Sequence, residues 1–181
     1  MNSGQIVTAV LEEGSPLGST LDFVVDANAP RGGMKHTFFT PDRKYAVQFF
    51  NDPRDGHNPN IQDRIRTIVS IYNPTLSEQA GGALGNTEKT AEYFRSRFCW
   101  PVAIVSQPEF GIVCPTYPQK FFFGGNASTN GLNLKGKDKK SNWFTGKNRR
   151  YLAKHELGDL KKLLQMSMML SRGIRRMHQA G

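Results

Sequence analysis

The amino-acid sequence predicts an α+β fold, in which an antiparallel five-stranded sheet and a helix are followed by further helices. Short segments rich in β-branched and aromatic residues recur up to about residue 118, separated by turns rich in Gly, Pro and Asp. One amphipathic pattern with helical spacing covers residues 61–69, and a longer one covers 156–181. The strand-like segments are interrupted by the first helical pattern and followed by the second. This order favours a mixed domain of sheet and helices.

Six segments have the composition of strands: residues 5–11, 20–25, 36–39, 45–50, 101–107 and 110–118. The turn PDRK at 41–44 has Pro and Asp at positions that turns favour, which predicts a hairpin between the third and fourth segments. The dipeptide at 108–109 marks the turn of a second hairpin. These segments supply the strands of the predicted sheet.

Three segments predict helices. Residues 61–72 are amphipathic and are closed by Asn73–Pro74, and residues 87–98 form a short helix that Pro101 stops. The stripe of Leu, Ile and Met over 156–181 predicts a long helix that ends at Gly181. Between the second and third of these helices, residues 119–150 have little periodicity, so we expect a long loop there.

The composition indicates an intracellular globular protein. The chain has 181 residues, 38% of them hydrophobic and 22% charged. It has no apolar run near the roughly 18 to 20 residues that a membrane span needs, and no secretory signal. We therefore expect a cytoplasmic protein without a membrane partner. Cys99 and Cys114 lie among apolar residues without further ligands at metal-binding spacing, which indicates buried free thiols.

The net charge of +9 is concentrated in residues 135–154, which hold eight Lys or Arg against one Asp. Trp143, Phe144 and Tyr151 are interleaved with these cations. Such a segment can neutralise phosphates and stack on bases, so a nucleic-acid-binding protein is one rival interpretation. A solvated basic loop is the commoner origin of such a charge run.

The stretch APRGGMKHTFF at 29–39 predicts a glycine turn between two strands. Glycines in such a turn let backbone N–H groups approach phosphate oxygens. Neither G-x-x-x-x-G-K-[ST] nor G-x-G-x-x-G occurs, which excludes a P-loop and a dinucleotide fingerprint. The sequence HELGD at 155–159 lacks the second His of a metalloprotease motif and is better read as the capped start of a helix.

A glycine lid, a third strand, a helix, two more strands and a long helix ending in IRRMHQAG resemble the protein kinase family. The resemblance runs from about residue 15 to the end of the chain. It implies a kinase N-lobe with nucleotide lid and hinge at 1–118, followed at 119–181 by a basic loop and the first long helix of a C-lobe. Its implied activity is transfer of the ATP γ-phosphate to a protein hydroxyl, with Mg²⁺ as second cofactor.

The family's V-A-I-K lysine is absent, because YAVQ at 45–48 places Gln48 where that lysine would stand. Residues 30–38, PRGGMKHTF, are similar to the G-R-G-S-F-K-T-V-Y pattern of the with-no-lysine kinases. This resemblance implies that Lys35 replaces the missing cation and is the catalytic lysine. Pro30 departs from the pattern, which puts the closing geometry of the lid in doubt. A solvated lysine is the alternative.

The resemblance also implies a nucleotide-binding set and a carboxylate partner for Lys35. Ala46 would form the adenine ceiling, Cys114 would be the gatekeeper, and the backbones of Pro115 and Tyr117 would meet the adenine. The full nucleotide-binding set is Arg31, Gly32, Gly33, Met34, Ala46, Cys114, Pro115 and Tyr117. Three carboxylates are alternatives for the partner of Lys35: Asp63, Glu88 and Glu92.

The combination of GGMK, YAVQFF, FCWP and IRRMHQAG is most similar to a bacterial kinase group. That group occurs beside von Willebrand-type and phosphatase proteins in tellurite-resistance-like clusters, which implies such proteins as partners. The 181 residues contain neither the H-R-D loop nor D-F-G, so we expect no phosphate transfer and no Mg²⁺ ligands from them alone. The chain would then be either part of a kinase or a short kinase-derived binding module. A scaffold that docks partners on its last helix is the third class.

Overall fold

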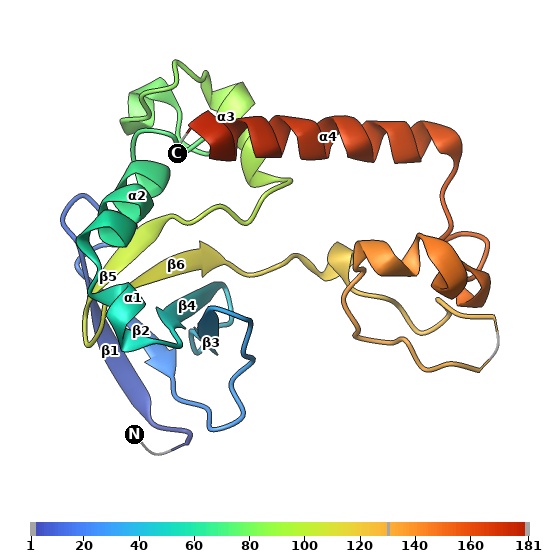
Figure 1. Cartoon of the computed structure of the whole chain (residues 1–181), viewed down its shortest axis with the longest axis horizontal. Helices are drawn as coiled ribbons and strands as arrows, with labels where there is room; N and C mark the ends of the chain where they lie inside the picture. Colours follow the sequence, from blue (N-terminus) through green and yellow to red (C-terminus); the bar gives the residue numbers. More distant parts are fainter. Residues whose placement is uncertain (1–2, 130, 180–181) are drawn as a thin grey trace. The chain divides into compact units, whose positions relative to one another are not determined.

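A computed structural model describes residues 3–129 and 131–179. The chain forms two compact units. The first unit extends to Thr116 and includes the chain again from Gly173, and the second unit is Tyr117–Arg172 (Figure 1). Each unit has its own apolar core.

The first unit is built on a closed barrel of six antiparallel strands (Figure 1). The order around the barrel is β1-β2-β3-β4-β6-β5, and β1 pairs with both β2 and β5. The strands are β1 (Ile6–Leu11), β2 (Thr20–Val24), β3 (Lys35–Phe39), β4 (Tyr45–Phe50), β5 (Ala103–Gln107) and β6 (Gly111–Pro115).

The predicted open five-stranded kinase N-lobe sheet is therefore wrong. Val10 pairs with Gln107 and Leu11 with Val105, so the first strand joins the two ends of the sheet. Pairing both edges satisfies backbone groups that an open sheet would expose, which is a sufficient reason for closure. The described fold is α+β in content, but the barrel dominates it.

Alternating side chains fill the barrel. Phe23, Val47, Val105 and Val113 have no exposed surface, and Phe38 packs against the rings of Phe23 and Phe49. Because side chains along a strand alternate between its two faces, the residues between these point out of the barrel. The outward-pointing residues of β3, β4 and β6 form the candidate functional site.

Four short helices join β4 to β5. They are α1 (Pro53–Gly56), α2 (Pro59–Val69), the 3₁₀ turn η1 (Glu78–Ala80) and α3 (Glu88–Arg95). Asp52, Asn58 and Thr87 cap the N-termini of α1, α2 and α3 with their side chains. Beyond the C-terminus of α2, the buried Asn73 amide donates to Val69 O at 2.9 Å and to Pro101 O at 3.2 Å, which holds the following loop to the body of the unit.

The second unit is largely irregular but packed. Its described 3₁₀ turns are η2 (Gln119–Phe121), η3 (Ser141–Trp143) and η4 (Gly146–Tyr151). Phe123, Ala127, Leu134 and Leu152 are buried together, and Trp143 and Phe144 pack against them. The segment expected to be a long loop therefore has a core of its own, made from apolar residues too widely spaced to show a period.

The last helix, α4 (Leu160–Gln179), begins after Asp159, whose carboxylate accepts from the Lys162 N–H at 2.8 Å. The prediction of a long amphipathic helix is confirmed, with its start four residues later than Glu156. Much of its apolar stripe is exposed: Leu160, Leu163, Leu164, Met166, Met168, Leu170, Ile174 and Met177. Within the described residues, no helix combines the length and hydropathy required to span a membrane.

Candidate functional site

The candidate site is the outward face of β3, β4 and β6, which we call the outer face. Its residues are those that alternate with the barrel interior: Lys35, Thr37, Phe39, Ala46, Gln48, Phe50, Ile112 and Cys114. Lys35 stands opposite Phe50, Thr37 opposite Gln48, and Ala46 opposite both Phe39 and Cys114. The ladder therefore brings the predicted lysine, the glutamine and the predicted gatekeeper onto one surface.

Lys35 lies partly buried on this face. Its ammonium is 5.0 Å from the centroid of the Phe50 ring, within the range of a cation–π interaction. Burial lowers the pKa of Lys35 from its usual 10.5, and the nearby Cys114 thiol acts in the opposite direction. Lys35 has no ion pair with any other residue that the structure describes. A partly desolvated cation without a carboxylate is suited to receiving an anion.

Gln48 holds the position at which the resemblance to protein kinases implies a lysine. Its side-chain amide lies 3.5 Å from the Thr37 hydroxyl oxygen on the neighbouring strand. Lys35 and Gln48 are diagonal neighbours across the β3–β4 ladder. Such neighbours lie within reach of long side chains, so the two can contact the same ligand.

The predicted lid is a tight hairpin turn. Arg31 pairs with His36, and Gly32 N donates to Lys35 O at 2.8 Å. Asn51, directly after β4, holds the turn with two hydrogen bonds. Its side-chain amide donates to Gly32 O at 2.9 Å, and its backbone N–H donates to Met34 O at 2.8 Å. Sequence analysis did not single out Asn51, since nothing local marks a contact across the β3–β4 pair.

The tip of the lid offers backbone donors. The N–H groups of Gly33 and Met34 have no hydrogen-bond partner among residues 3–129 and 131–179. Neither Gly32 nor Gly33 takes a positive φ, and a Cβ added at Gly33 would meet nothing within 4 Å. The fold itself therefore does not require glycine at position 33, which leaves approach of a ligand as a reason for its presence.

The predicted adenine-binding residues divide between the two units. Ala46 and Cys114 are buried neighbours, and Pro115 pairs with Tyr45 at the end of β6. Burial raises the pKa of Cys114 to about 12, so its thiol stays protonated at neutral pH. Tyr117 begins the second unit, where its exposed ring meets Phe121 edge-on.

The three alternative carboxylate partners of Lys35 contact arginines. Asp63 on α2 pairs with Arg66 at 3.2 Å, whereas Glu88 and Glu92 on α3 both pair with Arg95. A carboxylate partner for Lys35 thus stays a prediction. Across the described ranges, no three His, Cys, Asp or Glu residues cluster as metal ligands would.

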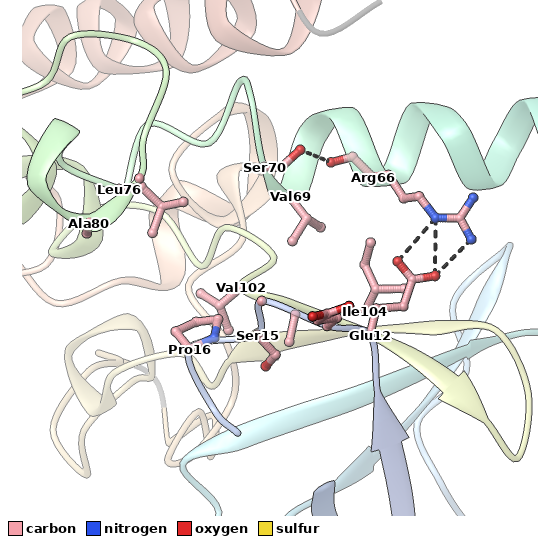
Figure 2. A pocket seen from close by; sticks show the side chains of 14 residues that line it. Glu12, Ser15, Pro16, Arg66, Val69, Ser70, Leu76, Ala80, Val102 and Ile104 are labelled. Atoms are coloured by element: carbon pink, nitrogen blue, oxygen red, sulfur yellow. Dashed lines mark hydrogen bonds and ion pairs between the residues drawn. The ribbon is translucent and has the colours of Figure 1, made fainter. Parts of the chain in front are cut away.

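A second feature of the first unit is a cavity of about 430 Å³ beneath α2, bounded by β5 and by the turn that follows β1 (Figure 2). Glu12 and Arg66 lie at its edge, with both carboxylate oxygens bound by the guanidinium at 2.8 to 3.1 Å. Sequence analysis missed this cavity, because its walls come from four segments whose proximity depends on barrel closure.

The basic segment 135–154 contributes aromatic rings to the core of the second unit. The Trp143 ring lies edge-on to Phe123 at 5.9 Å, and Phe144 lies 6.2 Å from the same ring. Tyr151 is bound by Arg150 through its hydroxyl and its ring face. These contacts cover part of each ring and leave each side chain half-buried.

Comparison of the chain with protein-family models, curated proteins and solved structures finds no match.

Proposed function

We propose that the outer face and the lid at 31–34 bind the phosphates of ATP, with Lys35 as the principal cation. The observation that carries the proposal is the Lys35 ammonium, which is partly desolvated above Phe50 and has no carboxylate partner in the described part of the chain. A phosphate placed against it would supply the missing negative charge in a setting of low dielectric.

The remaining groups fit the same ligand. The N–H groups of Gly33 and Met34 can donate to phosphate oxygens from above, and Arg31 adds a second cation beside them. Ala46 adds only a small apolar side chain to the same face, and its neighbour Cys114 is uncharged at neutral pH. The carbonyl of Pro115 is an acceptor for an adenine amino group, as the resemblance to kinases implies.

The activity proposed for this site is that of a serine/threonine-type protein kinase. A protein hydroxyl oxygen would bond to the γ-phosphorus of ATP while the bond from that phosphorus to the bridging oxygen of ADP breaks. The hydroxyl proton would go to a carboxylate base. Lys35 would stabilise the charge on the phosphates, whereas the H-R-D and D-F-G groups that supply base and metal ligands are absent from these 181 residues.

The test is titration of the purified chain with ATP by calorimetry, comparing wild type with Lys35→Met. The matched control is Lys44→Met, since Lys44 is an exposed lysine in the β3–β4 turn and pairs only with Asp42 among the described residues. We expect Lys35→Met to weaken ATP binding at least tenfold and Lys44→Met to leave it unchanged. Equal affinities in the wild type and the Lys35→Met variant would refute the proposal.

A non-catalytic scaffold is the second candidate, and the exposed apolar residues of α4 favour it. This role predicts stoichiometric binding of a partner protein that Lys35→Met does not alter. The kinase role instead predicts loss of ATP affinity in that variant. One variant therefore separates the two.

A further inference from the structure

The cavity beneath α2 is the second feature of the first unit with the form of a binding site. Val69 on α2 and Leu76 in the loop after it line the cavity on one side, and Ile104 on β5 and Val102 just before β5 line it on the other (Figure 2). Its volume of about 430 Å³ is larger than one aromatic side chain and falls in the range of ligand pockets, about 300–1,000 Å³. An apolar wall of this size, open at its mouth, is suited to an apolar group of a ligand.

Apart from Glu13, the charged and hydroxyl side chains that line the cavity are bonded within the chain. The Ser70 hydroxyl donates to Arg66 O at 2.6 Å, and the Ser15 hydroxyl oxygen accepts from the Leu17 N–H at 3.1 Å. The Arg66 guanidinium holds both oxygens of Glu12. A ligand therefore gains little from these groups, and its binding energy must come from removing apolar surface from water.

The charged residues at the mouth of the cavity determine which charged groups a ligand can carry next to its apolar group. Glu12 pairs with the guanidinium of Arg66, and Glu13 lines the cavity without an ion pair to any residue that the structure describes. Two lining carboxylates against one guanidinium leave an acidic mouth on a chain whose net charge is +9. This charge repels phosphates and attracts a cation placed next to the apolar group.

We propose that this cavity binds a short peptide segment of a partner protein through one bulky apolar side chain flanked by basic residues. The apolar side chain would fill the space between Val69 and Ile104, and a flanking cation would lie against Glu13. This proposal does not depend on nucleotide binding at the outer face.

The experiment uses the full ¹⁵N-labelled chain and the synthetic tripeptide acetyl-Arg-Phe-Arg-amide, followed by amide chemical shifts. We expect the largest shifts at Val69, Leu76 and Ile104. The control peptide acetyl-Arg-Ala-Arg-amide lacks the ring and should bind at least tenfold more weakly. Acetyl-Glu-Phe-Glu-amide keeps the ring, reverses the charge and should also bind at least tenfold more weakly.

Two variants and one further probe complete the test. Ala80→Trp places a ring in the cavity from an exposed position and should weaken the first peptide at least tenfold, whereas Glu13→Lys should weaken it three- to tenfold in low salt. Should Ala80→Trp fail to fold, indole added to the wild-type chain must shift the same amides and be displaced by the peptide. Equal binding of the Phe and Ala peptides, shifts confined to other surfaces, or failure of indole to compete would overturn the proposal.

Discussion

The Lys35 ammonium lies 5.0 Å from the centre of the Phe50 ring, its partner across the β3–β4 ladder. The ring faces the charge, but it replaces only part of the hydration that the ammonium loses. The cation on the outer face is therefore held at some expense to the stability of the fold.

Removing that charge should stabilise the chain without ligand. The folded-state pKa of Lys35 lies below its unfolded value of 10.5, so the unfolded chain binds more protons between the two values and stability rises with pH in that window. We expect Lys35→Met to have a higher melting temperature than wild type at pH 7, with a difference that shrinks toward pH 10.5. A difference independent of pH over this range would contradict the desolvation argument.

Gly33→Ala should separate binding from folding. A Cβ at this position meets nothing within 4 Å and the backbone φ is not positive, so the melting temperature should change little. If phosphate oxygens approach the backbone here, the added methyl group should weaken ATP binding several-fold. Calorimetric titration beside thermal unfolding of the same variant checks both halves of this expectation.

Gly111→Ala is the contrasting substitution in the barrel wall. A Cβ there would lie 2.6 Å from Gln48 O and 2.8 Å from the Phe49 ring, and the backbone oxygen cannot move without disturbing the β4–β6 pairing. Overpacking of this kind costs typically about 1–3 kcal/mol. Urea unfolding would measure this cost, and an unchanged midpoint would show that the barrel wall can accommodate a methyl group at position 111.

The Glu12–Arg66 contact should contribute modestly to stability. Its side chains are 28% and 42% exposed, so solvent screens the pair in spite of its two-pronged geometry. A double-mutant cycle with Glu12→Gln and Arg66→Met is expected to give a coupling of about 0.5–1 kcal/mol. A coupling near zero would mean that α2 is held to the barrel by apolar contacts alone.

Phe123→Ala tests the core of the second unit. Phe123 is 1% exposed and contacts Trp143 and Phe144, so its truncation should destabilise that unit by about 3–5 kcal/mol. The emission of Trp143 should shift to longer wavelength as its surroundings become wetter. Unaltered emission, with Trp100 replaced by Phe to remove its background, would favour a loosely held ring available to nucleic acid.

Local pattern was sufficient for the strands and for the long helix. The apolar and aromatic composition of 45–50 and the amphipathic spacing of 61–69 are signals within a few residues, and each marks an observed element, although α2 begins at Pro59. Placement of Lys35 and Cys114 on one face follows from strand parity once the neighbours are known. Those neighbours are set by pairing between distant segments, which no local period encodes.

Local sequence pattern could not predict the closure of the barrel or the cavity beneath α2. The pairing of Val10 with Gln107 depends on side chains that also suit an ordinary edge strand. The same holds for Arg66, whose charge suits an exposed helix face until β1 brings Glu12 to it. Contacts between remote segments decide which of two locally acceptable arrangements forms.

The pairing of Val10 with Gln107 also has a consequence for biosynthesis. The first strand leaves the ribosome well before its second neighbour has been made, and at about 5–20 residues per second the delay is roughly 5–20 s. During this interval one of its edges is open to other nascent chains. Of the six barrel strands, β1 thus waits longest for its second neighbour, which makes residues 6–11 a natural place for a chaperone to act.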